Sequence, residues 1–155
     1  MPSSPAMDIL IAAVGRWKSD PARALYEDYA ARSAWPIVLR EVEEKRKLPA
    51  AALKEREAAL LLATLPRRDC RVVVLDGGGR GLTSPALAAQ LGRWRDAGTA
   101  TVAFLIGGTA GRGTAALARG DLVLSLGPPT WPHLLVRGLV AEQLYRAQQI
   151  LTGHP

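Results

Sequence analysis

Two stretches in the last third of the chain decide its fold: Leu105-Ile106-Gly107-Gly108 and Leu124-Ser125-Leu126-Gly127-Pro128-Pro129-Thr130-Trp131-Pro132-His133. In each, a short apolar run gives way to glycine or proline, as at the carboxyl end of a buried strand. The carboxyl ends of parallel strands meet at one edge of a sheet, so the backbone groups of both loops can converge on one ligand there. The sequence therefore predicts a small-molecule site at this edge.

The rest of the chain alternates between strand and helix patterns. We expect strands over residues 9–14, 37–42, 72–75, 101–106 and 122–126. Helices are expected from residue 21, over 50–65, over 84–97, over 114–118 and from about residue 132 to 152, the first capped by Asp20. This alternation predicts an α/β fold, a single-domain parallel sheet with helices on both faces. Residues 1–6 are expected to be a disordered extension that precedes the domain of residues 7–155.

Composition narrows the class of protein. The net charge of +6 and the isoelectric point near 10.1 favour a polyanionic partner, although a basic surface that only confers solubility is the alternative. The single cysteine, Cys70, cannot form an intramolecular disulfide and suits a reducing cytoplasm, where we expect a structural thiol. No apolar run approaches the roughly 18 residues that cross a bilayer, so we expect no membrane insertion.

The glycine-rich run Gly77-Gly78-Gly79-Arg80-Gly81 does not have the spacing of a nucleotide-binding loop. The third glycine of a G-x-G-x-x-G motif would fall on Leu82, and no Gly-Lys-Ser/Thr follows. This disfavours a nucleotide-binding module of the flavodoxin type. The run is expected to form either a flexible strand-to-helix turn or part of the wall beside the substrate.

The chain resembles the RlmH family of the SPOUT superfamily from Met7 to Pro155. The resemblance lies in an opening strand over residues 8–15, in Val74-Leu75-Asp76, in Leu105-Ile106-Gly107-Gly108, and above all in the block Pro132-His133-x-x-Val136-Arg137-x-x-Val140-Ala141-Glu142-x-Leu144-Tyr145-Arg146-Ala147. The family consists of bacterial methyltransferases that use S-adenosylmethionine to methylate N3 of a pseudouridine in helix 69 of 23S rRNA. They act as homodimers on the assembled 70S ribosome.

The resemblance implies the same reaction, cofactor and partners for this chain, without a metal ion. It also implies a C-terminal trefoil knot whose loops form the donor pocket. Threaded chains are rare, so the expectation of a knot rests on the resemblance alone.

The resemblance also implies roles for individual residues. Cofactor contacts, largely from the main chain, are expected at Leu75, Gly108, Gly127, Pro128, Pro129, Thr130, Trp131 and Pro132. Trp131 could instead fill the core. The expected catalytic residues are His133, Arg137 and Arg146: an arginine would stabilise the N3 anion, and His133 would orient the base or relay its proton.

Other charged residues have less specific interpretations. Glu142 and Arg146 have i, i+4 spacing and could form only a surface ion pair. Candidate contacts with the RNA backbone are Arg16, Lys18, Lys45, Arg46 and Lys47, each of which could be merely solvated.

Two departures from the family pattern bear on catalysis. Thr109-Ala110 stands where the family has Pro-Glu, which removes a carboxylate from the pocket rim. The family also continues with Tyr-His-Arg or Tyr-His-Lys where this chain ends at His154-Pro155. We expect either a truncated sequence or a divergent member, and the alternative function is that of a noncatalytic RNA-binding or ribosome-binding protein.

Overall fold

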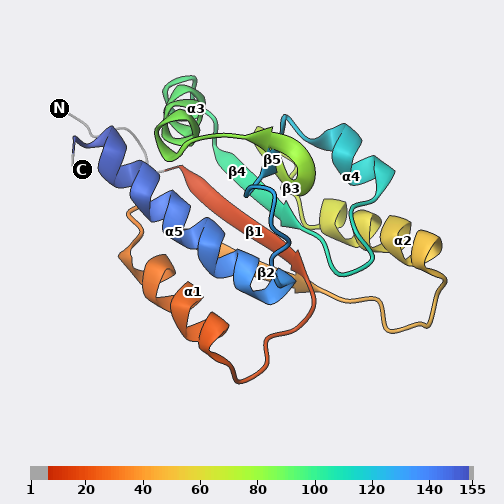
Figure 1. The fold of residues 1–155 in the computed structure, drawn as a ribbon. Coiled ribbons are helices and arrows are strands. Elements are labelled where there is room, and N and C mark those ends of the chain that lie inside the picture. Colours follow the sequence, from red (N-terminus) through yellow and green to blue (C-terminus); the bar gives the residue numbers. More distant parts are fainter. Residues whose placement is uncertain (1–6, 154–155) are drawn as a thin grey trace.

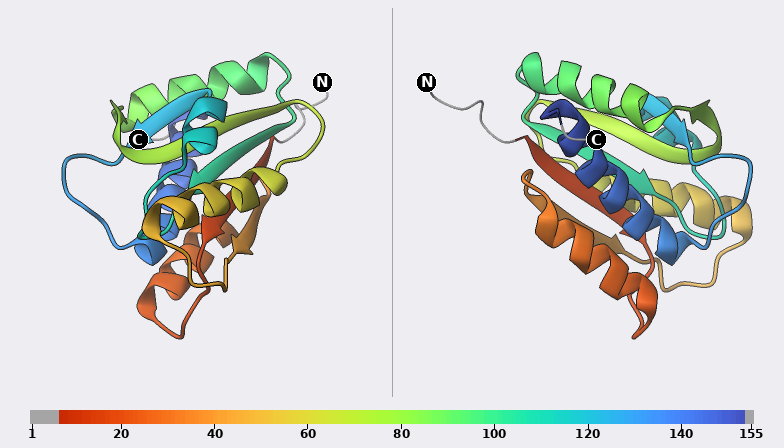
Figure 2. Two further views of the ribbon diagram at one scale, coloured as in Figure 1. Left: turned by 90° about the vertical axis from the view of Figure 1, so that its right-hand side faces the viewer. Right: turned by 60° about the vertical axis from the view of Figure 1, so that its left-hand side comes forward.

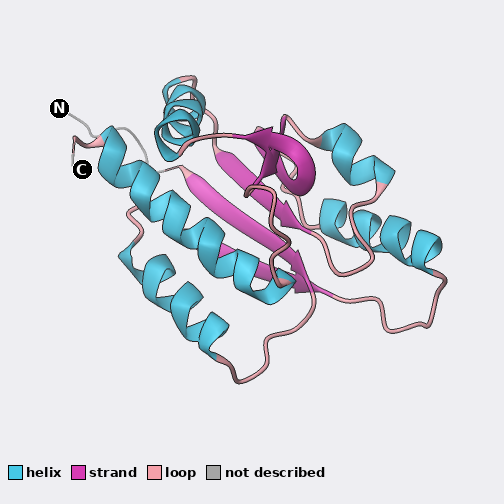
Figure 3. Cartoon of the chain, viewed as in Figure 1, coloured by secondary structure: helices cyan, strands magenta, loops and turns pink. Residues whose placement is uncertain are grey.

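A computed structural model describes residues 7–153 as one parallel five-stranded sheet with the order β2-β1-β4-β3-β5 (Figure 1). The strands are β1 (Asp8–Val14), β2 (Ile37–Val42), β3 (Cys70–Gly81), β4 (Thr101–Ile106) and β5 (Leu122–Ser125). The helices are α1 (Pro21–Arg32), α2 (Ala50–Ala63), α3 (Ser84–Asp96), α4 (Thr114–Arg119) and α5 (His133–Leu151) (Figure 3). The predicted α/β sheet is confirmed. The extension expected at residues 1–6 lies outside the described residues.

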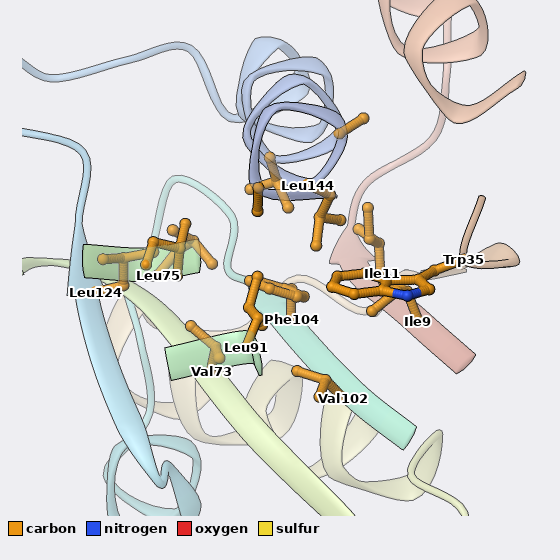
Figure 4. Packing of buried hydrophobic residues seen from close by; sticks show 14 of the residues in the cluster. Ile9, Ile11, Trp35, Val73, Leu75, Leu91, Val102, Phe104, Leu124 and Leu144 are labelled. Carbon is orange, nitrogen blue, oxygen red and sulfur yellow. The ribbon is translucent and has the colours of Figure 1, made fainter. Parts of the chain in front are cut away.

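Helices cover both faces of this sheet because side chains alternate along each strand. Ile9 and Ile11 of β1 lie in the core beneath α1, α3 and α5, which also contains Phe104 and Leu144 (Figure 4). Leu10 belongs to a second core shared with α2 and α4. All six residues of β4 are buried, as expected for the central strand of a sheet covered on both faces.

The apolar stripe predicted for the last helix packs into the first of these cores. Val136, Val140, Leu144 and Ala147 of α5 are all buried, and the helix lies between α1 and α3 (Figure 2). Asp20 caps α1 as predicted, accepting a hydrogen bond from the Arg23 amide at 3.2 Å. Within residues 7–153, no helix is both long and apolar enough to cross a membrane.

The end of β3 corrects the flexible turn, which was one of the two interpretations of Gly77–Gly81. The strand continues to Gly81 and bulges so that Leu124 of β5 lies opposite both Leu75 and Arg80. A Cβ on Gly79 would lie only 2.6 Å from the Val123 carbonyl oxygen, so the missing side chain is what allows this close approach. Glycine content alone suggests a turn, whereas pairing with β5 imposes an extended path. In Figure 1 this part of β3 curls beside β5.

Candidate active site

A cleft of about 610 Å³ opens at the carboxyl ends of β4 and β5 and beside the middle of β3, where its bulge begins. This volume lies within the range of roughly 300–1,000 Å³ that is usual for small-molecule sites. The structure brings every residue expected to contact the cofactor, together with His133, to this cleft. Its lining includes Leu75, Gly108, Gly127, Pro128, Pro129, Thr130, Trp131, Pro132 and His133.

The loop from Leu126 to Pro132 is held at both ends and open in the middle. Gly127 has a φ of +102°, and its amide donates to Ser125 Oγ at 3.1 Å. The Trp131 indole donates to the Leu126 carbonyl oxygen at 3.2 Å, although the residue remains 41% exposed. Within residues 7–153, the Thr130 amide donates no hydrogen bond, so it is free to contact a ligand.

The segment after β4 forms the opposite wall in a tight turn. Gly111 donates its amide to the Gly108 carbonyl oxygen at 3.1 Å, and its φ of +97° suits glycine. A Cβ on Gly108 would lie 2.9 Å from Val14 Cγ1 and 3.5 Å from both carboxylate oxygens of Glu57. Glu57 is 7% exposed, and its Oε1 has no partner in the described chain. Burial raises the pKa of this carboxyl.

Arg112 is a cleft residue that the sequence interpretation missed. It follows the turn, lines the cleft beside Thr109, and donates from Nε to the Leu75 carbonyl oxygen. The sequence offered one signal for Arg112, its position four residues after Gly108. That signal is weak because a charged residue in a loop is usually solvated. The structure therefore adds a cation to a wall expected to consist mainly of backbone.

Arg137 is fully buried at the start of α5. Its guanidinium contacts Glu41 at 2.6 Å, donates to the carbonyl oxygens of Val14 and Gly15 at 3.3 and 3.0 Å, and lies 4.5 Å from the centre of the Trp17 ring. Glu41 also accepts a hydrogen bond from the Trp17 amide at 2.7 Å. We call these residues, Val14, Gly15, Trp17, Glu41 and Arg137, the arginine clamp. The clamp ties α5 to the ends of β1 and β2.

His133 joins the clamp to the cleft. Its Nε2 lies 3.2 Å from where a Cβ on Gly15 would be, and Arg137 is one helical turn further along α5. Burial, followed by the charges of Arg137 and Arg112, lowers the pKa of His133. A neutral imidazole is thereby favoured near pH 7, and a neutral imidazole can accept a proton.

Arg146 does not join this group within one chain. It is 13 residues beyond His133 on α5, about 20 Å along the helix. Its guanidinium pairs with Glu142, and its side chain is 54% exposed. The i, i+4 ion pair predicted as an alternative is therefore present. Elsewhere on the surface, Arg16 pairs with Glu43 and Arg46 with Glu44, so both are engaged with carboxylates.

A second cavity of about 380 Å³ lies between α3 and α5 and shares Leu124, Leu126, Gly127 and Trp131 with the cleft. Its other walls are largely apolar, and Ser84 donates to Gln143 at 2.7 Å at its rim. Residues 7–153 contain no group of three or more side chains suited to hold a metal ion.

The parallel sheet and its strand-end cleft define an α/β protein with a small-molecule site built from loops. Residues 7–155 match the family model described as a predicted SPOUT methyltransferase. The ribosomal RNA large subunit methyltransferase H of Paramagnetospirillum magneticum is 56% identical over 149 residues, which cover 96% of this chain and 97% of that protein. The proteins of the same name from Rhodospirillum rubrum and Rhodospirillum centenum are 52% and 50% identical, with the same coverage. The chain belongs to the RlmH family of SPOUT methyltransferases.

Proposed function

We propose that this protein transfers a methyl group from S-adenosylmethionine to N3 of a pseudouridine in bacterial 23S rRNA, at position 1915 in helix 69. The observation that carries this proposal is the full-length likeness to large-subunit rRNA methyltransferases, at 56% identity in one case. It is supported by the cleft, whose lining matches the positions that the family resemblance assigns to the cofactor.

The cleft suits S-adenosylmethionine in size and chemistry. Its walls combine apolar side chains of Leu75, Leu124 and Val136 with the free amide of Thr130 and the cation of Arg112. A ligand with an apolar nucleoside face and a charged amino-acid end needs both kinds of surface. When bound, the cofactor supplies an electrophilic methyl group on a positively charged sulfur.

The protein must place the base in line with that methyl group and favour loss of the N3 proton. His133 is suited to accept or relay this proton because it lies at the cleft and its pKa is lowered. Arg137 is buried in the arginine clamp, so we assign it the role of a positioning residue that fixes His133 and stabilises a neutral imidazole by its charge.

The protein is proposed to act as a homodimer on the 70S ribosome in the cytoplasm. Arg146 and the cleft are about 20 Å apart along α5, so in this account Arg146 would contact RNA beside the cleft of a partner chain. Arg32 lies over the rings of Tyr29 and Tyr145 at 5.3 and 5.8 Å on the same side of α5, giving a surface where a second copy or RNA could pack. Sedimentation showing only a species of the 16.5 kDa chain mass would contradict the dimer.

We also propose that the chain forms the trefoil knot of its family. The support is the curled end of β3, which pairs with β5 on both sides of its bulge. The chain passes directly from β5 into the Leu126–Pro132 loop. An experimental chain trace through residues 75–135 is the test, and an unthreaded path would contradict the knot.

The test of function uses ribosomes from a strain that lacks this methylation. Incubation with the full-length protein and S-adenosylmethionine should add one methyl group at the pseudouridine, as measured by mass spectrometry of digested rRNA. A control reaction uses rRNA in which that position remains uridine. Absence of methylation by folded protein that binds the cofactor would contradict the enzyme and support the noncatalytic RNA-binding alternative.

A further inference from the structure

The side chain of Arg112 is fixed at one end inside the cleft. Its Nε donates to the carbonyl oxygen of Leu75, the residue of β3 at which the bulge begins. Its Cδ and Nε lie 3.1 and 3.4 Å from where a Cβ on Gly107 would be, so the glycine leaves room for the arginine stem. The guanidinium is thus held between Leu75 in the middle of β3 and Gly107 just after the end of β4.

The other end of the guanidinium is free. Neither Nη atom of Arg112 has a hydrogen-bond acceptor or a carboxylate partner among residues 7–153. The adjoining turn offers no acid, because it contains Thr109 and Ala110. Asp76 also lines the cleft, but among residues 7–153 it forms no ion pair with Arg112, and its Oδ2 accepts the Gly78 amide at 3.0 Å. By contrast, both Nη atoms of Arg137 are hydrogen-bonded in the arginine clamp.

A guanidinium held in this way is suited to bind a planar anion with two oxygens. Arginine stays charged at all physiological pH values, and its two Nη groups match the spacing of a carboxylate. Fixing the Nε in advance reduces the side-chain entropy that binding would otherwise cost.

We propose that Arg112 is the residue that recognises the carboxylate of the amino-acid part of the methyl donor. This inference rests on the proposed function, since it assumes that the cleft holds that donor. A phosphate of the RNA is the other anion to consider. The carboxylate is favoured because the tether to Leu75 keeps the guanidinium among the residues that line the donor cleft.

Calorimetry with two related ligands tests the proposal on the full-length protein. S-adenosylhomocysteine carries the carboxylate, whereas methylthioadenosine keeps the nucleoside and the sulfur but lacks the amino-acid part. Arg112→Gln should weaken S-adenosylhomocysteine binding roughly tenfold to a hundredfold, the range expected for a lost hydrogen bond to a charged group. Binding of methylthioadenosine should change less than about twofold.

Two further variants serve as controls. Arg112→Lys should recover part of the lost affinity, because it restores the charge without the fork. Arg93→Gln removes an exposed arginine of α3 and should change neither affinity.

The outcomes separate the possible errors. Equal weakening of both ligands by Arg112→Gln would overturn the proposal in favour of a packing role. Unchanged S-adenosylhomocysteine affinity combined with weaker rRNA binding would overturn it in favour of a phosphate contact. If folded wild-type protein binds neither ligand, the proposed function itself fails and this inference fails with it.

Discussion

Two regions at the same end of the molecule differ in whether their polar groups have hydrogen-bond partners. In the arginine clamp, the buried Arg137 guanidinium is bound by a carboxylate, two carbonyl oxygens and an aromatic ring. In the facing loop and turn, the Thr130 amide and the Nη groups of Arg112 have no partner in the described chain. We infer from this difference that the clamp stabilises the fold, whereas the polar groups without partners are available to bind a ligand.

The largest expected effect comes from breaking the clamp. Arg137→Ala should lower the free energy of unfolding by about 3 kcal/mol, because it breaks a buried ion pair and leaves the Glu41 carboxylate without its cation. Urea denaturation is the measurement. Arg146→Ala on the same helix is the matched control and should cost no more than about 0.5 kcal/mol, since its ion pair is solvent-exposed. Equal stability of the two variants would contradict the structural role of the clamp.

A smaller loss is expected where β3 curls against β5. Gly79→Ala should destabilise the fold by about 2 kcal/mol, because the new methyl group would meet the backbone of Val123 at 2.6 Å. Gly81→Ala is the control in the same segment, since nothing lies within 4 Å of its added Cβ. Thermal unfolding that ranks the two variants in the reverse order would mean that β5 is not packed against this part of β3.

The two glutamates Glu55 and Glu57 of α2 should respond to pH in opposite directions. Burial raises the pKa of Glu57 in the folded state. The protonated carboxyl therefore contributes fully to the free energy of unfolding below the unfolded-state pKa, and this contribution is lost as pH rises through the folded-state pKa. Near neutral pH, Glu57→Gln should therefore be more stable relative to the wild type than it is at acidic pH, by about 1 kcal/mol. The reason is that the substitution removes a buried charge without a partner.

Glu55 supplies the matched comparison. Its pKa is lowered, chiefly because it accepts a hydrogen bond from the Thr114 amide. Its contribution is present above the unfolded pKa and is lost as pH falls through the folded pKa, so Glu55→Gln should reduce the stability seen at neutral pH. Unfolding curves between acidic and neutral pH measure both variants. The same slope for both would show that Glu57 is not buried as an unpartnered carboxyl.

The smallest effect on stability is expected in the open loop. Trp131→Ala should change the free energy of unfolding by no more than about 0.5 kcal/mol, because the residue is 41% exposed. The affinity for S-adenosylmethionine should nevertheless fall, because Trp131 lines the cleft and its indole hydrogen-bonds the two ends of the loop together. Calorimetry on a variant that unfolds like the wild type makes this check. A large loss of stability would place Trp131 in the core, the alternative considered from the sequence.

The sequence predicted the architecture well because local patterns control it. Apolar runs define β2 and β4 with the predicted bounds, and the predicted stripe of α5 is buried. The flexible turn, one of the two interpretations of Gly77–Gly81, was wrong, because pairing with a strand more than forty residues away overrides the glycine content. The sequence also could not show that Arg137 would be buried, since its partner Glu41 lies 96 residues earlier in the chain.

The candidate site was predictable to the same degree. The loops expected to bind the cofactor do line one cleft, because strand ends converge wherever parallel strands pair. The separate roles of the arginines were not predictable, because they depend on contacts between distant segments. Arg112, Arg137 and Arg146 differ little as residues in a sequence, yet one lines the cleft, one is buried and one is exposed.

The central claim is that the donor binds across the open loops while the arginine clamp stays unchanged. The most direct test is to titrate ¹⁵N-labelled protein with S-adenosylmethionine and to monitor the chemical shifts of the backbone amides by NMR. The account predicts that the largest shifts occur at Gly108, Gly127, Thr130 and Trp131, with little change at Gly15 and Trp17. Binding that instead shifts Leu82, Leu139 and Gln143, which line the second cavity, would contradict it, as would the absence of any shift in folded protein.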